Sequence, residues 1–413
     1  MVTIVPLWRH SAPLLALCLL LRPLTPLEAA PSCNETLGEL QQLVDQIGAA
    51  GGGDVMLPCG RTEISAELVL PSGVRLRGAA GVPGKGCQAS TLALCRPNPY
   101  IVRFGDGVHL RTGIQGVTFD CRNLLTPAPG NAPGIGRAAV AATSHALSGT
   151  EVLISDCAFL SIPMADQSYH AIGLANLEAT VRNNWVNQSG GDALNFNSGQ
   201  YIIDGNHVHD VGDGCVALNN NALGVVSNNI LQRCNLAIGC GPEGSQRDNN
   251  THPFIISGNL IEDSDYGVLL GWFGFVGGEG PTEVVVTGND LLRCRTASIR
   301  YDGNPNGTDG FLTVAGNRIS RAGEFPQQLP PPGSQQPSPN AGNGIVVVGI
   351  RDVTVENNVV SDGYEKSARA CPATSVAVFG SFTLRELFAL RTILRVTAAG
   401  TAAQSLFRVR TSK

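Results

Sequence analysis

The feature that most constrains the fold is a frame that recurs eight times along the chain. In each copy an apolar residue lies three positions before an Asn, or once a Cys, and a second apolar residue lies two positions after it. The anchors are Cys157, Asn184, Asn206, Asn229, Asn259, Asn289, Asn317 and Asn358. Each copy is too short to bury its own apolar residues, so neighbouring copies must stack. The pattern therefore predicts a solenoid of short, stacked strands.

Composition suits a chain of tight turns and buried strands and argues against a nucleic-acid partner. The 413 residues include 50 glycines, only 15% are charged, and the formal net charge is −5. Aromatic residues, at 5%, are too few for broad surfaces on which bases stack. An acidic chain also repels nucleic acid. We therefore expect no nucleic-acid partner.

The first 30 residues have the pattern of a secretory signal peptide. Arg9 and His10 precede an apolar stretch over residues 14–21, which is too short to span a bilayer. Cleavage is expected near Ala29 or Ala30. We expect a secreted, extracellular protein with no membrane span in the mature chain. A retained N-terminal anchor is the alternative.

Cysteines and glycosylation sequons fit the same compartment. Removal of residues 1–30 takes Cys18 from the twelve cysteines and leaves an odd number, so one thiol stays free or pairs between chains. Close pairs that can form disulfide bonds around small loops are Cys87 with Cys95 and Cys234 with Cys240. Four Asn-X-Ser/Thr sequons predict a glycoprotein. These sequons start at Asn34, Asn187, Asn249 and Asn306.

A helix is expected soon after the signal, followed by two short strands. Leu37, Leu40 and Val44 have helical spacing, and glycines over 51–53 end the helix. The strands lie in Gly-Gly-Asp-Val-Met-Leu-Pro and in Leu-Val-Leu-Pro-Ser-Gly-Val-Arg-Leu-Arg-Gly, which ends at Gly78. A helix at this place would cap the open end of the stack.

The order of this helix and these two segments resembles the entry to the pectate-lyase superfamily. With the repeats, the resemblance covers residues 35–365. It implies an all-β fold: a single-stranded right-handed parallel β-helix with an N-terminal capping helix, over residues 31–374. The superfamily includes lyases, hydrolases, epimerases and inert binding proteins. The resemblance therefore implies an extracellular polysaccharide as partner without fixing the reaction.

The anchor asparagines have a structural interpretation. Successive coils lie about 4.8 Å apart, so one anchor Asn per coil can form a hydrogen-bonded ladder along the stack.

The basic segment 375–413 has an amphipathic pattern around residues 384–394, which predicts a C-terminal cap helix.

Two glycine-led carboxylates are candidate catalytic residues. Asp192 and Asp213 lie 21 residues apart, close to one turn of the stack, so both would project from one side of neighbouring coils. Like charges this close oppose double ionisation, and such a pair is the arrangement of glycoside hydrolysis. His170 lies about one coil earlier and can join the same row as a catalytic group. The structural alternative is a Gly-Asp turn in each coil.

The stretch that begins at Asp192 is also similar to the active-site run of polygalacturonase-type hydrolases. Asp192 and Asp213 match two aspartates of that run. Gly214 stands where the second member of an Asp-Asp pair is expected, and Leu-Ala-Ile-Gly over 236–239 replaces the family's Gly-His-Gly. Ser-Ile-Arg, ending at Arg300, is the nearest match to its Arg-Ile-Lys. The resemblance therefore implies a degenerate active-site run.

Substrate contacts are expected from Arg300, Tyr301 and Trp272. Arg300 can bind a uronate carboxylate, and Trp272 can stack on a sugar ring or pack beneath its own loop. A lyase would also need a cation, and Ca²⁺ prefers oxygen ligands. Candidate ligands are Glu262, Asp263, Asp265 and Asp302. Their spacing fits no fixed motif, so no cofactor is expected unless the protein is a lyase that uses Ca²⁺.

These observations predict a secreted polysaccharide-active protein. The first hypothesis is an enzyme of glycosidase or lyase type that cleaves an extracellular glycan, with uronate-containing glycans among the candidates. The second is a non-catalytic glycan-binding or matrix protein, which the absent second Asp and the absent His favour. The third is a Ca²⁺-dependent lyase or epimerase.

Overall fold

The computed structural model describes residues 37–79, 89–126, 137–142, 151–165, 167–241, 254–271, 283–302, 308–322, 343–348, 350–361 and 376–379. The chain divides into two units, residues 1–32 and 33–413, and every described residue belongs to the second. The predicted signal peptide and Trp272 lie outside the described residues, as do the sequons at Asn34, Asn249 and Asn306.

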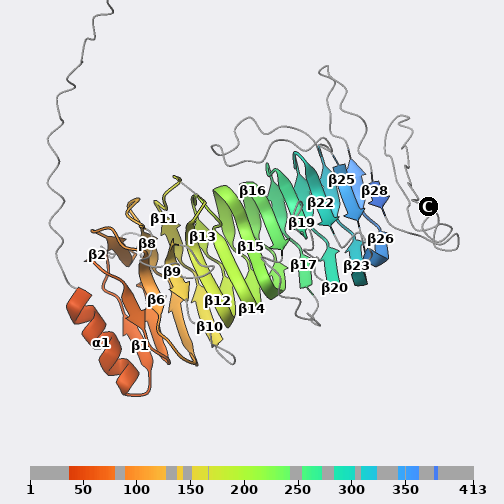
Figure 1. Cartoon of the computed structure of the whole chain (residues 1–413). Coiled ribbons are helices and arrows are strands. Elements are labelled where there is room, and N and C mark those ends of the chain that lie inside the picture. The colour runs from red at the N-terminus through yellow and green to blue at the C-terminus, as the bar shows by residue number, and fades with distance from the viewer. Residues whose placement is uncertain are drawn as a thin grey trace, which may run out of the picture. The chain divides into compact units, whose positions relative to one another are not determined.

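Helix α1 (Leu37–Ala49) packs on the first coil of strands, and the predicted N-terminal cap is confirmed (Figure 1). Val44 is fully buried, and Ile47 packs against the core. The helix stops at glycine: the N–H of Gly52 donates to the Ile47 carbonyl at 2.9 Å, and the φ of Gly52 is 101°. A Cβ at Gly52 would lie 2.5 Å from the carbonyl oxygen of Gly73, so a larger residue does not fit. No helix in the described ranges has the length and apolarity to cross a membrane.

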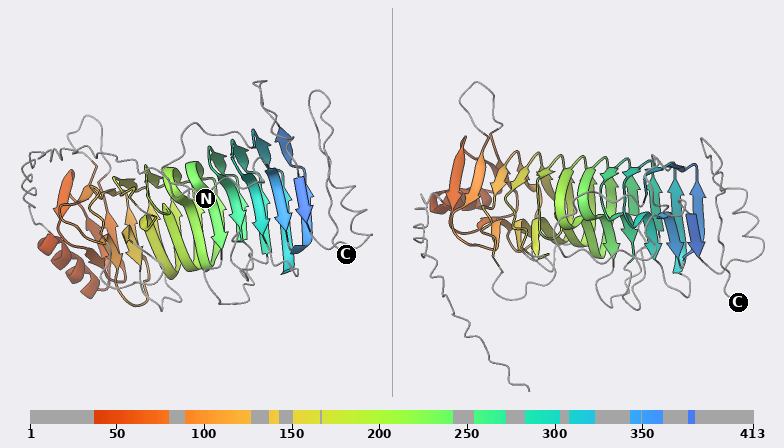
Figure 2. Two further views of the ribbon diagram at one scale, coloured as in Figure 1. Left: turned by 45° about the horizontal axis from the view of Figure 1, so that its top comes forward. Right: turned by 90° about the horizontal axis from the view of Figure 1, so that it is seen from above.

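The strands are parallel and wind into successive coils with three faces (Figures 1 and 2). Face 1 contains β3 (Leu68–Leu70), β6 (Tyr100–Phe104), β9 (Arg137–Ala142), the first parts of β12 (Tyr169–Arg182) and β14 (Leu194–Asp204), the middle of β15 (His207–Ser227), the end of β16 (Ile230–Gly241), β19 (Tyr266–Leu270), β22 (Ala297–Asp302), β25 (Asn343–Val348) and β28 (Val376–Phe379).

Face 2 contains β1 (Gly53–Met56), β4 (Val74–Arg77), β7 (Thr112–Gln115), β10 (Glu151–Ser155), the last parts of β12, β14 and β15, β17 (Phe254–Ser257), β20 (Glu283–Thr287), β23 (Thr308–Ala315) and β26 (Ile350–Glu356). Face 3 contains β2 (Arg61–Ile64), β5 (Thr91–Leu94), β8 (Thr118–Asp120), β11 (Ala158–Leu160), β13 (Trp185–Val186), the first parts of β15 and β16, β18 (Leu260–Glu262), β21 (Asp290–Leu292), β24 (Arg318–Ser320) and β27 (Val359–Ser361). Each strand pairs with the strand of the same face in the neighbouring coil, which is the predicted stacking.

The core consists of rows of apolar residues that the register aligns from coil to coil. One fully buried row on face 1 is Val140, Ile172, Leu194, Val216 and Ile238. Burial of one such aliphatic side chain contributes about 1.5–3 kcal/mol. A single coil cannot obtain this burial alone, so stacking stabilises the fold.

The anchor asparagines form the predicted ladder, at the turn between faces 2 and 3. The Nδ2 of each Asn donates to the Oδ1 of the next at 2.9 Å along the row Asn184, Asn206, Asn229, Asn259, Asn289, Asn317 and Asn358. Each Oδ1 also accepts the backbone N–H of the preceding anchor. Cys157 precedes the row: its backbone N–H donates to Asn184 at 3.0 Å, and its thiol is free and buried.

The cysteine pairing differs from the sequence prediction. Cys234 forms a disulfide with Cys215, whereas Cys240 is free, so the predicted pair of Cys234 with Cys240 is wrong. Cys215 and Cys234 come from neighbouring coils, and the stack brings them together although Cys240 is closer in sequence. Cys59 and Cys95 each form a disulfide as well. Cys87, the predicted partner of Cys95, lies outside the described residues, so that pair stays a prediction.

The parallel sheet continues past residue 374, the predicted end of the β-helix. Strand β28 pairs with β25 along Val376, Ala377, Val378 and Phe379. This apolar run continues the rows of the preceding coils, which a boundary based on basic composition did not anticipate. The segment 384–394, predicted as a cap helix, lies outside the described residues.

Candidate active site

His170, Asp192 and Asp213 lie on three successive coils of face 1. The register aligns Ile172 of β12 with Leu194 of β14, and Leu194 with Val216 of β15. Two positions before these residues, it places His170, Asp192 and Gly214 in one row, with Asp213 next to Gly214. The register thus places the three candidate residues on successive coils, while their catalytic roles stay predictions.

Asp213 lies in an irregularity of strand β15. The pairing of β15 with β16 shifts register between Val211 and Gly214, so Gly212 and Asp213 together oppose Asn235. Such a bulge redirects a side chain without ending the strand. Asp213 is partly buried, and burial raises the pKa of its carboxyl to about 6. This carboxyl can therefore hold a proton at mildly acidic pH and donate it.

The Asp192 carboxylate is held at both oxygens. The N–H of Gly214 donates to Oδ1 at 2.9 Å, and the Nδ2 of Asn195 donates to Oδ2 at 3.0 Å. N–H donors stabilise the negative charge of a carboxylate and fix its orientation. A Cβ at Gly214 would lie 2.5 Å from Oδ1, so a larger residue there would displace the carboxylate. This gives a physical role to the glycine that replaces the second Asp of the polygalacturonase-type run.

His170 supports Asp192 from the preceding coil. Its Nδ1 lies 2.8 Å from the backbone carbonyl oxygen of Asp192, which can only accept, so Nδ1 carries the proton. Its Nε2 lies 3.4 Å from the Nδ2 of Asn195. The His170 side chain is 4% exposed. These contacts fit a residue that positions Asp192.

Asn195 and Asn197 belong to this network and were missed by the sequence reasoning. The Nδ2 of Asn197 donates to the Oδ1 of Asn195 at 3.0 Å, and both side chains are buried. They flank the inward-facing Phe196, so the signal in the sequence was the alternation of Asn, Phe and Asn in a strand. Alternation of this kind marks polar side chains that leave the core together.

Small residues surround Asn195 along its outward row. The register aligns Gly173, Asn195, Ala217 and Gly239 on four successive coils. Residues with little or no side chain let a ligand approach the strand backbone. All four residues are nevertheless buried in the structure.

The predicted substrate contacts in β22 are not in place for direct binding. Tyr301 is fully buried in the inward row that also contains Leu270 and Val347, so its prediction as a substrate-binding residue is wrong. Its ring fills the core. Arg300 points outward but is 4% exposed, and its guanidinium is paired with Asp302 through Nε at 2.6 Å and Nη2 at 3.1 Å. That ion pair neutralises the charge that a uronate would need.

The predicted calcium ligands do not converge. Asp263 is paired with Arg293, and Asp265 with Arg295. Glu262 accepts a hydrogen bond from Gln232 at 2.8 Å. In the described part of the chain, no three His, Cys, Asp or Glu side chains are grouped so that they can hold a metal ion. These residues therefore do not fit a Ca²⁺ site.

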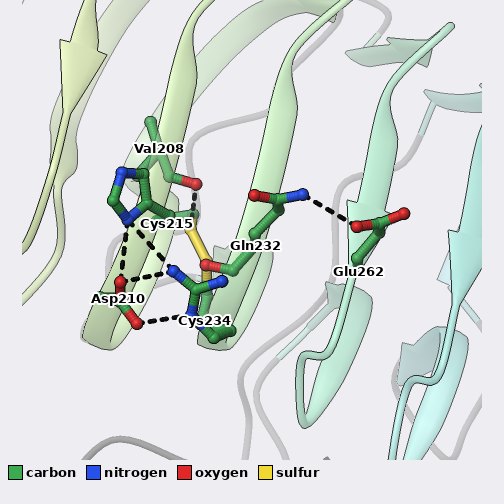
Figure 3. A network of polar contacts seen from close by, with 8 residues as sticks. Val208, Asp210, Cys215, Gln232, Cys234 and Glu262 are labelled. Atoms are coloured by element: carbon green, nitrogen blue, oxygen red, sulfur yellow. Dashed lines mark hydrogen bonds and ion pairs between the residues drawn. A yellow bond between two sulfur atoms is a disulfide. The ribbon is translucent and has the colours of Figure 1, made fainter.

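A separate ionic cluster on face 3 lies beside the disulfide (Figure 3). The Nε and Nη2 of Arg233 donate to the two carboxylate oxygens of Asp210, both at 2.6 Å, and the Nδ1 of His209 lies 2.9 Å from Asp210. The hydrogen bonds from Arg233 lower the pKa of Asp210. The cluster joins the two coils that the disulfide Cys215–Cys234 also joins. It therefore supports the segment that carries Asp213.

Of the four sequons, the structure describes the asparagine of one. Asn187 follows β13, is partly exposed, and donates its backbone N–H to Phe159 at 3.3 Å. Glycosylation at this position stays a prediction.

Comparison with known proteins supports the same architecture. Residues 138–276 match the family model described as right handed beta helix region. The chain is a right-handed parallel β-helix protein. This confirms the fold implied by the resemblance to the pectate-lyase superfamily. No curated protein matches the sequence of this β-helix protein.

Solved structures share the architecture at low sequence identity. DFA-IIIase from Arthrobacter chlorophenolicus A6, without its lid and in complex with GF2, superposes with a TM-score of 0.54 and 13% identity, covering 92% of this chain and 98% of that chain. The mannuronan C-5 epimerase A-module of Azotobacter vinelandii gives 0.44 and 15%, covering 84% and 97%. An exopolygalacturonase from Thermotoga maritima gives 0.46 and 12%, covering 79% and 86%. At these identities the likeness establishes the β-helix fold alone.

Proposed function

We propose that this β-helix protein is a secreted carbohydrate-active enzyme that cleaves an extracellular polysaccharide bound across face 1. The observation that carries the proposal is a pair of carboxyls on neighbouring coils in unlike surroundings. Partial burial raises the pKa of Asp213 to about 6, whereas the Asp192 carboxylate accepts hydrogen bonds from two N–H groups that stabilise its charge. Two carboxyls kept in opposite protonation states suit glycoside hydrolysis.

The two carboxyls would divide the reaction between them. Protonated Asp213 donates its proton to the glycosidic oxygen as the bond to the anomeric carbon breaks. Ionised Asp192 either takes a proton from the attacking water or attacks the anomeric carbon itself. His170 and Asn195 hold Asp192 in place and are positioning residues.

Secretion and the polysaccharide partner are supported by different observations. The signal-like segment at residues 1–30 and the disulfide Cys215–Cys234 suit an oxidising compartment. DFA-IIIase, which superposes with a TM-score of 0.54, was solved in complex with GF2, and this supports ligand binding on this fold.

A non-catalytic glycan-binding protein is the second candidate function. Both oxygens of Asp192 are engaged in hydrogen bonds within the protein, and Gly214 contributes no side chain. The same contacts would keep the coils in register in a protein that only binds its glycan. A Ca²⁺-dependent lyase is disfavoured because Asp263, Asp265 and Asp302 are each paired with an arginine.

A product assay distinguishes these functions. The purified secreted protein is incubated at pH 5 with pectate, alginate, laminarin and inulin, each with and without EDTA. New reducing ends report cleavage, absorbance of unsaturated uronates reports a lyase, and NMR of the recovered polymer reports epimerisation. The proposal expects new reducing ends on one of these glycans, without unsaturated product and unaffected by EDTA.

The variant Asp192→Asn/Asp213→Asn tests the assignment of the carboxyls. Loss of an acid–base group lowers the rate by about 10²–10⁴-fold, so we expect at least a hundredfold lower rate. Asp106→Asn is the matched control, because the Asp106 side chain is 86% exposed and follows β6, three coils before Asp192. Unchanged activity of the double variant would rule out these carboxyls, and glycan binding without any product would favour the binding protein.

A further inference from the structure

Face 2 carries a groove that is separate from the candidate active site. Its volume is about 700 Å³, and it extends across the coils from β4 to the last part of β15. The residues used below that line it are Arg111, Glu151, Glu178, Arg182, Gln200 and Ile202. They all project from face 2 or its margin, whereas Asp192 and Asp213 belong to face 1. Nothing in the proposed reaction uses this groove.

One row along the groove consists of polar side chains without a partner among the described residues. The register aligns Glu151 with Glu178, and Glu178 with Gln200, on three successive coils. All three are exposed. Among the described contacts, none of these side chains takes part in a hydrogen bond or ion pair. Two carboxylates directly opposite each other on paired strands repel, so this row is costly to the fold and available to a ligand.

A second row beside it is mostly apolar. The register aligns Leu153, Thr180, Ile202 and Val225 on the same and the following coil. Ile202 is exposed to 50%. A polar row and an apolar row thus run side by side along the stack. Both repeat once per coil, at about 4.8 Å.

The free charges of the groove are balanced. Glu151 and Glu178 contribute two negative charges, and the exposed Arg111 and Arg182 contribute two positive charges. A third arginine in the lining, Arg75, is already paired with Asp54 at 2.6 Å. The centre of the groove is acidic, because the two carboxylates are register partners. A polyanion would be repelled there, whereas a neutral ligand would not.

We propose that the face 2 groove is a second binding site, for a neutral linear polysaccharide that lies along the stack. Sugar rings present hydroxyl groups at their edges and C–H groups on their faces. The row of Glu151, Glu178 and Gln200 accepts hydrogen bonds from the hydroxyls, and the row around Ile202 contacts the C–H faces. Repetition once per coil suits a chain ligand. The inference rests on the proposed function only for the class of ligand, a carbohydrate.

Affinity electrophoresis of the full chain tests the proposal. The gels contain laminarin, inulin or hydroxyethylcellulose as neutral polymers, or pectate as the anionic one. The groove variant is Glu151→Ala/Glu178→Ala/Ile202→Ala. All three residues are exposed, so we expect the variant to fold, and its melting temperature checks this. The matched control is Glu283→Ala/Glu356→Ala, which removes two carboxylates of the same face outside the groove. The variant Asp192→Asn/Asp213→Asn reports on face 1.

The expected result is retention by one neutral polymer that weakens at least tenfold in the groove variant and stays unchanged in the control. Equal retention of the groove variant and the wild type overturns the proposal but leaves the proposed function, which the product assay measures, intact. Retention by pectate alone that depends on the groove also overturns it, since the ligand would then be a polyanion. Dimers that dissociate in the groove variant, as seen by sedimentation, would assign the groove to a second copy of the chain. Absence of retention and of product with every polymer would overturn both proposals together.

Discussion

Asp213 is the residue whose environment matters most for the account of the site. Partial burial withholds water from the ionised carboxyl of Asp213, which is why its pKa rises to about 6. Its neighbour in the stack, Asp192, is bonded at both oxygens by N–H donors. The two side chains have the same chemistry and acquire different behaviour from the bulge in β15 and from the amide of Asn195.

The buried carboxyl makes stability depend on pH. The native state keeps the Asp213 proton up to about pH 6, whereas the unfolded chain releases it near about pH 4. The native state therefore binds more protons in this window, and the free energy of unfolding falls as the pH rises through it. Asp213→Asn cannot ionise, so we expect it to be more stable than the wild type by about 2–3 kcal/mol at pH 7 and equally stable at pH 3.5.

Denaturant unfolding at several pH values measures this difference. Asp106→Asn is the control, because its side chain is 86% exposed and its removal should give the same shift at every pH. A stability gain of Asp213→Asn that does not change between pH 3.5 and 7 would contradict the buried, protonated carboxyl.

The pH dependence of the activity should follow the protonation of Asp213. If Asp213 is the general acid, kcat/KM decreases as the pH rises through about 6, by a factor of ten per pH unit above it. A pH–rate profile on the glycan identified by the product assay checks this. A profile that stays flat from pH 5 to 8 would remove Asp213 from the role of acid.

For individual residues, the sequence predicted the coil on which a side chain lies better than its burial and its partners. The spacing of Asp192 and Asp213 was enough to place both on neighbouring coils. It did not reveal that Tyr301 faces inward. Arg300 and Tyr301 are adjacent in β22, so their side chains point to opposite faces of the strand, and the spacing does not show which of the two enters the core. Nor did spacing show that Arg300 is paired with Asp302, a contact within a single strand.

At the scale of elements, the asparagine ladder should be most sensitive at its centre. Asn229 is fully buried, and Ala at this position leaves the N–H groups of Asn206 without their acceptor. We expect Asn229→Ala to cost about 2–4 kcal/mol, since buried donors lose their partners. Asn358 ends the ladder and is partly exposed, so water can replace it and Asn358→Ala should cost about 1 kcal/mol or less.

Thermal unfolding of the two alanine variants, monitored by circular dichroism, compares the positions. Equal losses at Asn229 and Asn358 would show that the ladder contributes no more in the core than at its end. That result would contradict the role assigned to burial.

The disulfide should stabilise the coils that carry Asp213. Cys215 and Cys234 are separated by 19 residues in sequence and join neighbouring coils. A loop of this size restricts the unfolded chain, so Cys215→Ala/Cys234→Ala should lower the free energy of unfolding by about 3 kcal/mol. Unfolding in urea with and without a reducing agent tests this: the wild type should lose about 3 kcal/mol more on reduction than the double variant, which keeps the disulfides of Cys59 and Cys95. Insensitivity of the wild type to reduction would refute the contribution.

The elements show why repeats are predictable and cross-links are not. The apolar residues around each anchor are local, so the strands, the turn and the ladder follow from sequence alone. The partner of Cys234 depends on which residues two coils bring face to face, and Cys215 is farther away in sequence than Cys240. The register shift at Gly212 and Asp213 is likewise a property of the pair of coils.

For the whole molecule, stacking creates two distinct surfaces. Face 1 gathers His170, Asp192 and Asp213 from three coils. Face 2 carries the groove with the row of Glu151, Glu178 and Gln200. Both surfaces consist of residues that are about one coil apart in sequence, so neither could exist without the regular stack.

The most direct test of the account is a crystal structure of the inactive variant Asp192→Asn/Asp213→Asn with an oligosaccharide of the glycan that the wild type cleaves. The account predicts a sugar ring on face 1, with its glycosidic oxygen within hydrogen-bond distance of the side chains at positions 192 and 213. An oligosaccharide on face 1 that touches neither position, or binding that leaves face 1 empty, would contradict it.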